Sequence, residues 1–255
     1  MAAKATISPA ELVSGTRVVA ARELGAYFDS PIAYVYTIAF VVLSNSIFMN
    51  EFFLTGRVEM RGFFDRMPLL LTVFLPAVTM RLWAEERKQR TLELLLTLPI
   101  VPVQAILGKF FAALALFGLF LAGSIPIVIM LSALGSPDLG LIVSGYIGVM
   151  FLGTLFLSFG MFLSALSGDQ IIAFVMSTVL GCIFIFSGND KVVAILDGLF
   201  PSLQIGTILN DTISVMPHYD AFVAGTVELS SIVFFTTFSA AFVWLNSVVL
   251  EKTRA

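Results

Sequence analysis

Five long stretches of this chain contain neither an acidic nor a basic residue. They cover residues 30–50, 110–137, 139–168, 170–189 and 229–250. A helix needs about 20 mostly apolar residues to cross the ~30 Å hydrocarbon core of a membrane, and each stretch is about that long. In lipid every backbone N–H and C=O group must be paired within the protein, and these stretches lack the alternation of barrel strands. The stretches therefore predict membrane-spanning helices.

The composition agrees with this prediction and excludes several classes of protein. Hydrophobic residues make up 58% of the 255-residue chain, charged residues only 12%, and the mean hydropathy is +1.00. Soluble domains carry about 25% charged residues, so neither a soluble enzyme nor a disordered protein is expected. The net charge of −3 is spread thinly and predicts no nucleic-acid partner. One cysteine, Cys182, and one histidine, His218, exclude an intrachain disulfide and a histidine metal site.

A sixth uncharged window, 67–80, is long enough to cross if its helix extends over 63–84 and its terminal charges reach the interfaces. We therefore predict an all-α polytopic membrane protein in a lipid bilayer, with a six-span domain over 32–255. The predicted spans are about 32–52, 63–84, 106–134, 141–167, 170–187 and 230–250.

The remaining segments are predicted to lie at the membrane surfaces. Residues 1–31 should form a cytoplasmic interfacial helix that ends at Ser30-Pro31. The long 188–229 connection should hold short helices that dip into the outer interface. Pro76 and Pro126 should kink the second and third spans.

The positions of lysine and arginine predict the orientation of the spans. One side carries ten of these residues: Lys4, Arg17, Arg22, Arg81, Arg87, Lys88, Arg90, Lys109, Lys252 and Arg254. The other side carries four: Arg57, Arg61, Arg66 and Lys191. Both termini, the 85–105 segment and the tight 167–170 turn are therefore predicted to face the cytoplasm, with Asp169 capping the fifth span.

Several nucleotide-binding and catalytic motifs are absent from the sequence. The only Gly-Lys pair, Gly108-Lys109, is followed by Phe110 and has no P-loop pattern around it, so no nucleotide site is predicted. No nucleophile elbow occurs either. Ionisable residues deep in the spans are nearly absent, which argues against an ion-coupled carrier. The chain is not expected to be an enzyme or to hold a cofactor of its own.

The segment 85–105 is the most informative part of the chain. A charged run, Glu85-Glu86-Arg87-Lys88-Gln89-Arg90, precedes a short amphipathic helix. Thr91 would cap this helix, Leu92, Leu95 and Leu96 would share one of its faces, and two prolines would end it. Two interpretations stay open on these residues alone. The apolar ridge either docks into a soluble partner or lies in the membrane interface beside a solvated charge run.

This stretch, Glu-Glu-Arg-Lys-x-x-Thr-Leu-Glu-Leu-Leu-Leu-x-x-Pro, resembles the signature of ABC-2-type transporter permeases. Together with the six-span layout, the resemblance covers nearly the whole chain. The chain departs from the family pattern at Arg90, where a glycine usually precedes the threonine. The segment 21–34, Ala-Arg-Glu-Leu-x-x-Tyr-Phe-x-Ser-Pro-x-Ala-Tyr, is most similar to the small permeases named after gliding-motility and nitrous-oxide-reductase-maturation systems.

The resemblance implies a function and a set of partners. Two permeases, identical or different, would pair in the inner membrane, and separate ATP-binding cassette subunits would bind ATP and Mg below them. The contacts with these ATPases would be made by Glu85, Glu86, Arg87, Lys88, Thr91, Leu92, Glu93, Leu95 and Leu96, with a smaller contact at Gly168 and Asp169. A periplasmic or membrane accessory protein is a further expected partner. ATP hydrolysis would reside in the partner subunit.

Other interpretations stay open for the spans. Ser44, Asn45 and Asn50 in the first span would either line a translocation path or form hydrogen bonds between helices. Gly160, Ser164 and Gly168 recur every fourth residue, which favours close helix packing. The complex would be an exporter, an ATP-driven mechanical relay acting on an outer partner, or, least favoured, a channel or carrier without an ATPase.

Overall fold

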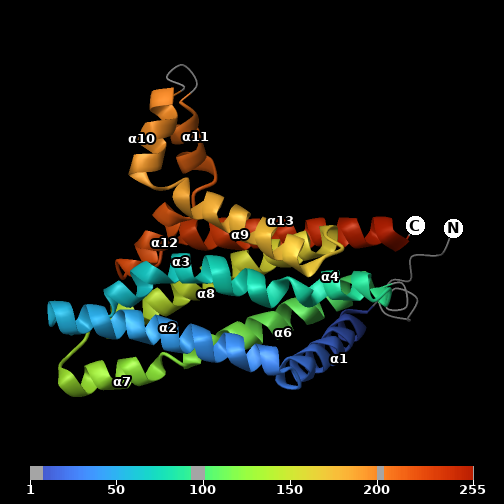
Figure 1. Ribbon diagram of the computed structural model, residues 1–255, viewed down its shortest axis with the longest axis horizontal. Helices are drawn as coiled ribbons and strands as arrows, with labels where there is room; N and C mark the ends of the chain where they lie inside the picture. Colours follow the sequence, from blue (N-terminus) through green and yellow to red (C-terminus); the bar gives the residue numbers. More distant parts are fainter. Residues whose placement is uncertain (1–7, 93–100, 200–203, 255) are drawn as a thin grey trace.

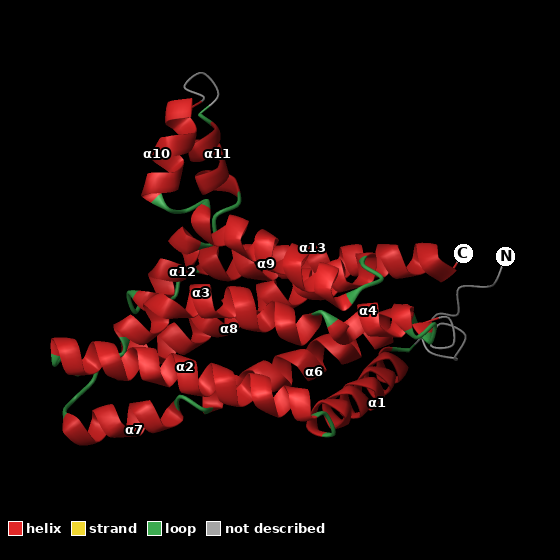
Figure 2. Ribbon diagram, viewed as in Figure 1, coloured by secondary structure: helices red, strands yellow, loops and turns green. Residues whose placement is uncertain are grey.

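The computed structural model describes residues 8–92, 101–199 and 204–254, and these residues form helices and connecting loops with no strand (Figure 2). Figure 1 shows long helices side by side along one axis, with one helical hairpin projecting from the side. The helices are α1 (Pro9–Phe28), α2 (Pro31–Thr55), α3 (Arg61–Thr79), α4 (Arg81–Lys88), α6 (Pro102–Ala122), α7 (Ile125–Leu134), α8 (Leu139–Leu166), α9 (Gln170–Phe186), α10 (Asp190–Leu199), α11 (Ile205–Thr212), α12 (Met216–Val223) and α13 (Leu229–Arg254).

Helix α8 is the central helix of the bundle and packs against α3, α4, α6, α9, α12 and α13. Its apolar side chains, among them Leu152, Phe156 and Phe159, are fully buried. Glycines allow the neighbours to approach closely. A side chain at Gly153 would clash with Phe117 of α6, and one at Gly148 would clash with Phe222 of α12. Small residues at such contacts allow helices to pack tightly where lipid surrounds them.

Five helical segments of the described chain are long and apolar enough to cross a membrane. They are Pro31–Thr55, Arg61–Lys88, Pro102–Leu134, Leu139–Leu166 and Leu229–Lys252. The all-α fold is thereby confirmed, and five of the predicted spans coincide with helices that are long and apolar enough to cross a membrane. Each boundary lies within a few residues of its prediction.

The sixth predicted span, 170–187, corresponds to α9. With 17 residues this helix is short for a ~30 Å hydrocarbon core. Helix α9 is long enough to cross a membrane only if Lys191–Leu199 is counted as part of the same span, and the two segments are bent by 91° relative to each other. Its crossing of the membrane stays a prediction.

Two spans are interrupted close to the prolines expected to kink them. The second span breaks at Met80, between α3 and α4, four residues after Pro76. The third breaks at Gly123-Ser124, just before Pro126 in the first turn of α7. Proline lacks the N–H that a helix needs and its ring crowds the preceding turn, which accounts for the break before Pro126. The break at Met80 comes after Pro76, and the Met80 N–H still donates to the Pro76 carbonyl at 2.8 Å, so Pro76 does not account for it.

Helix α1 lies along the first half of α6. It begins with a capping box, in which Ser8 Oγ accepts the Glu11 N–H and the Glu11 carboxylate accepts the Ser8 N–H. Gln104 Nε2 donates to the Glu11 carbonyl at 2.8 Å, and Val19 packs against Gly108 four residues further along α6. The predicted N-terminal helix is therefore present, while its place in the membrane interface stays a prediction.

The described residues of the 188–229 connection include the short helices α10, α11 and α12. Helices α10 and α11 form the projecting hairpin of Figure 1, and the Asp197 carboxylate accepts the Gly206 N–H (2.7 Å) and the Thr207 hydroxyl (2.7 Å) at the start of α11. Helix α12 returns to the bundle. Tyr219 Oη donates to the Phe64 carbonyl of α3 at 2.7 Å, and Ser144 Oγ of α8 donates to the Phe222 carbonyl at 2.8 Å.

Candidate coupling site at the end of helix α4

The charged run after the second span continues that span as helix α4. Glu85, Glu86 and Arg87 are half-buried on this helix, and Lys88 is exposed at its end. The sequence predicts these charges in a segment that leads into a new helix. They instead complete the last turns of the old one, because Leu82, Trp83 and Ala84 bury the opposite face of α4 against the bundle.

A compact turn ends α4. The Thr91 N–H donates to the Glu86 carbonyl (2.9 Å) and the Arg90 N–H donates to the Arg87 carbonyl (3.1 Å). These are the two hydrogen bonds that define a Schellman cap. Arg90 has φ of +56° at the position where such caps favour glycine. This is the one position at which the sequence departs from the family signature.

Side chains on α8 hold the α3–α4 break in place. Ser164 Oγ accepts hydrogen bonds from the Trp83 N–H (3.1 Å) and the Ala84 N–H (3.2 Å), and donates to the Met80 carbonyl at 2.8 Å. Gly160, one turn earlier, faces Thr79 so closely that a Cβ there would clash. Gly160 and Ser164 thus have the packing role predicted for the small-residue stripe. A Cβ at Gly168 would meet no atom within 4 Å, so Gly168 does not take part in this packing.

The two segments predicted to contact an ATPase lie side by side. Lys88 Nζ is 3.9 Å from Asp169 Oδ2, and the Lys88 side chain is 66% exposed and that of Asp169 42% exposed. Asp169 caps α9 as predicted, accepting the Ile171 N–H at 2.8 Å. Ser167 Oγ in turn accepts the Asp169 N–H, so the turn that carries Gly168 is held by its own hydrogen bonds. The result is one continuous surface at the end of α4 and the α8–α9 turn.

The remaining residues of the predicted coupling segment divide into two groups. The Thr91 hydroxyl donates to the Glu86 carbonyl at 3.4 Å, and Leu92 is 3% exposed and packs into the bundle. Glu93, Leu95 and Leu96 lie outside the described residues.

A buried ion cluster links α4 to α1 and α6, and sequence reasoning missed it. Lys109 of α6 is only 2% exposed, and its Nζ lies 2.9 Å from Glu86 Oε1 and 3.2 Å from Glu23 Oε1. The Trp83 ring covers the ammonium group, with its centre 5.0 Å from Nζ. The charge of Lys109 suggested a place at the cytoplasmic surface, although a lone lysine inside an apolar run signals a buried partner.

Electrostatics at Glu23 follow from this cluster. Burial alone would raise the pKa of the Glu23 carboxyl. The nearby Lys109 ammonium and the Arg22 guanidinium, whose Nη2 lies 2.7 Å from Glu23 Oε1, outweigh burial and hold the pKa below its usual value. Glu23 is therefore ionised in the folded protein at neutral pH.

Two of the three polar residues singled out in the first span, Ser44 and Asn45, form hydrogen bonds within the bundle. Ser44 is buried and donates to the Val41 carbonyl in its own helix. Asn45 Nδ2 donates at 3.0 Å to the Gly123 carbonyl, which the break between α6 and α7 leaves without a helical partner. Asn50 is exposed. These contacts favour the helix-bonding interpretation for Ser44 and Asn45 over a translocation path.

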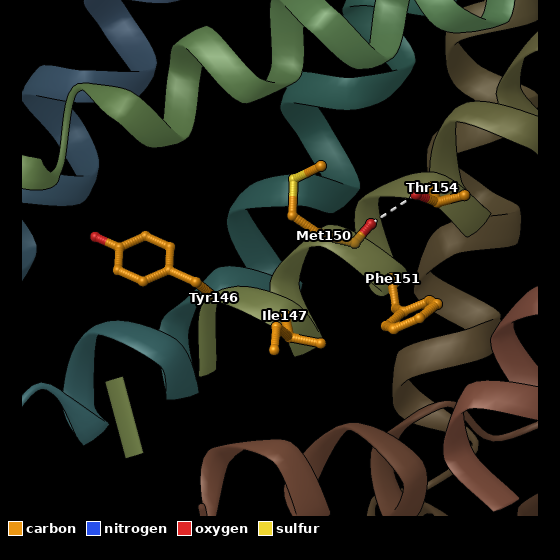
Figure 3. Close-up of a pocket in the computed structure, with 5 residues that line it drawn as sticks. All are labelled: Tyr146, Ile147, Met150, Phe151 and Thr154. Carbon is orange, nitrogen blue, oxygen red and sulfur yellow. Dashed lines mark hydrogen bonds between the residues drawn. The ribbon is translucent and has the colours of Figure 1, made fainter. Parts of the chain in front are cut away.

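A groove of about 270 Å³ runs along α8 and is lined by Tyr146, Ile147, Met150, Phe151 and Thr154 (Figure 3). Its polar atoms are already used. The Thr154 hydroxyl donates to the Met150 carbonyl (2.7 Å) and the Tyr146 hydroxyl lies 2.7 Å from Ser124 Oγ. The groove therefore presents an apolar surface with no group placed for chemistry.

Across the described ranges, no cluster of histidine, cysteine or acidic residues is arranged to hold a metal ion. Comparison with known proteins gives no family for this chain, since neither the protein-family models nor the curated proteins include a match.

Proposed function

We propose that this chain is the membrane permease subunit of an ATP-binding cassette exporter, coupled to separate ATPase subunits through the end of α4. One observation carries the proposal. The charged end of the second span and the α8–α9 turn, which the permease resemblance names as ATPase contacts, form one exposed surface joined at Lys88 and Asp169. The two segments are about 80 residues apart in sequence.

The local structure of this surface suits a docking function. A soluble partner can move a membrane helix only if its docking point is rigid relative to that helix. The Schellman cap fixes the end of α4, and the three hydrogen bonds of Ser164 fix the start of α4 to α8. A push on the end of α4 would therefore displace the second span and the central helix together.

Lys88 and Asp169 are the residues that meet the ATPase in this proposal. The end of α4 and the α8–α9 turn, which carry these residues, lie at the end of the bundle where α1 and the last turn of α13 also lie (Figure 1). Placing this end in the cytoplasm gives the orientation predicted from the lysine and arginine distribution. The chain itself supplies shape and charge to the contact, and ATP hydrolysis belongs to the partner.

The proposal is tested by crosslinking and affinity capture. The chain carries a C-terminal tag, is crosslinked through lysines in mild detergent with the products of its neighbouring genes, and its partners are identified by mass spectrometry. We expect an ATP-binding cassette subunit crosslinked to Lys88. Because Lys88→Glu removes the amine that the crosslinker needs, this variant is compared with the unmodified chain by affinity capture without crosslinker, where it should lose the ATPase. Arg57→Glu, an equally exposed charge reversal between α2 and α3, is the matched control and should retain capture. An oligomer without an ATPase would contradict the proposal.

A second candidate function, a mechanical relay acting on an outer partner, is favoured by the α10–α11 hairpin. This hairpin projects from the bundle, and its side chains Ile195, Leu199 and Ile208 are exposed. Removal of the hairpin distinguishes the two functions. A relay would keep ATP hydrolysis and lose its effect on the partner, whereas an exporter would keep both ATP hydrolysis and transport.

A further inference from the structure

The Lys109 cluster joins three helices through one buried ammonium group. Lys109 Nζ lies 2.9 Å from Glu86 Oε1 and 3.2 Å from Glu23 Oε1, and it lies over the Trp83 ring, 5.0 Å from the ring centre. These partners come from helices α1 and α4, while Lys109 belongs to α6. No ATPase contact is available to Lys109, because its side chain is 2% exposed.

Stability alone does not explain a charge at this position. Replacing a buried ion pair by apolar side chains is commonly neutral or stabilising. The neighbours of Lys109 along α6 include the buried apolar residues Phe110, Ala112 and Ala113, so an apolar side chain would continue the pattern of this helix. An ionisable residue within a span is a sign of function, and the geometry names its partners.

The cluster joins two packing units of the bundle. Helix α1 packs mainly on α6, and α4 packs mainly on α8. Although α1 and α4 belong to different units, α4 contacts or is linked to α1 near both ends of α4. At its start the Arg81 guanidinium lies 4.3 Å from the centre of the Tyr27 ring, and near its end Glu86 reaches Glu23 through Lys109.

We propose that Lys109 is a positioning residue that locks α1 to α4 through Glu23 and Glu86, so that any displacement of α4 is passed on to α1. The lock is a property of this chain alone, and its use in coupling rests on the proposed function. Because Arg81 also donates to Ser30 Oγ (3.3 Å) at the α1–α2 connection, motion passed to α1 would continue into the first span.

The lock is tested by a distance measurement between α1 and α4. Spin labels are attached to Ala21→Cys on α1 and Gln89→Cys at the end of α4, both exposed, in a Cys182→Ser background. We expect one narrow distance distribution in the starting protein. In Lys109→Met the distribution should broaden and shift to longer distances.

Because Lys109→Met takes the cation from the half-buried Glu86 and leaves Glu23 with Arg22 alone, it threatens folding, and a second variant keeps the test decisive. Lys109→Met with Glu23→Gln and Glu86→Gln removes all three charges, and should fold while still showing the broad distribution. Lys109→Glu with Glu86→Lys keeps one cation and two carboxylates, and should restore the narrow distribution. Arg22→Gln, which removes only an exposed partner of Glu23, is the control and should leave it unchanged.

The proposal is overturned if the triple variant has the narrow distribution of the starting protein. A functional measurement separates this result from the proposed function. With the ATPase subunit captured above, the triple variant should still bind the ATPase but lose the stimulation of ATP turnover by the permease. If even the unmodified chain captures no ATPase, the proposed function is wrong and the distance measurement alone decides on the lock.

Discussion

At the scale of single residues, Arg90 has a backbone conformation that favours glycine. Its φ of +56° places the arginine Cβ against its own carbonyl, which costs about 1–2 kcal/mol for residues other than glycine. Arg90→Gly should therefore raise the free energy of unfolding by about 1 kcal/mol, measured by thermal or denaturant unfolding in detergent. Gln89→Gly, one residue earlier at φ of −84°, should lower it. Equal effects of both substitutions would contradict the assigned cap.

A second residue-scale prediction concerns acid stability. The folded-state pKa of Glu23 is lowered, so its contribution is present above the ordinary value of 4.5 and is lost as the pH falls through the folded-state pKa. In unfolding measured against pH, the unmodified chain should lose stability below pH 4.5 more steeply than Glu23→Gln. Glu251→Gln, at an exposed site, should follow the unmodified chain. If the free energy of unfolding fell equally steeply with decreasing pH in Glu23→Gln and in the unmodified chain, the ion pair would be refuted.

Residue identity in the sequence predicts some of these features and hides others. The departure at Arg90 is visible by comparison with the permease signature, and Asp169 is recognisable as a cap because a polar residue precedes an apolar run. Lys109 is different. The apolar run around Lys109 signals a buried partner, but it does not identify Glu23, because that contact depends on α1, distant in sequence, packing beside α6. The charge of Lys109 therefore passes for that of a residue at the membrane surface.

At the scale of helices, the break between α3 and α4 depends on one hydroxyl. Ser164→Ala removes the acceptor of the Trp83 and Ala84 N–H groups and leaves them buried without a partner. We expect a loss of about 1–3 kcal/mol in unfolding free energy. Ser158→Ala on the same helix is the control, because the Ser158 hydroxyl bonds only to the Leu155 carbonyl of its own helix. The assignment fails if both variants lose the same stability.

The packing of α1 on α6 gives a second helix-scale prediction. A Cβ at Gly108 would lie 2.6 Å from Val19 Cβ and 3.1 Å from the Ala20 main-chain nitrogen. Side-chain rotation moves neither of these atoms, so the clash could be relieved only by a shift of the backbone. Gly108→Ala should therefore destabilise the protein by about 1–3 kcal/mol and loosen α1, seen as faster proteolysis within α1. Gly118→Ala on the same helix meets no atom within 4 Å and should stabilise by about 0.5–1 kcal/mol. Undisturbed proteolysis in Gly108→Ala would argue against this packing.

Helix positions follow from the sequence more reliably than helix ends. Uncharged windows fix where the spans lie, because apolar length is what a bilayer selects. Hydropathy predicts an end of the second span at residue 84, whereas α4 continues to Lys88. The charges after residue 84 resemble the end of a membrane-spanning helix. Glu86 nevertheless stays in the helix because it pairs with Lys109, and a hydropathy profile does not take such a pairing into account.

At the scale of the whole molecule, the path of the chain between α8 and α13 requires a further crossing of the bundle. Helix α8 ends at Leu166, beside α4. Helix α12, reached before α13 begins, instead contacts the opposite halves of α8 and α3, through Ser144 and Phe64. The chain therefore travels from one end of the bundle to the other between residues 167 and 216, and α9 is the long helix of that stretch.

This path predicts an even number of membrane crossings despite the shortness of α9. In a Cys182→Ser background, Gly168→Cys and Asn189→Cys, both exposed, place a thiol at each end of α9. A membrane-impermeant maleimide should label Gly168→Cys only from the side that holds the C-terminal tag, and Asn189→Cys only from the other side. Labelling of both thiols from the same side would mean that α9 enters and leaves by one face. The chain would then have five spans, and its two termini would lie on opposite sides of the membrane. The lysine and arginine distribution would no longer place α1 and the end of α13 together in the cytoplasm.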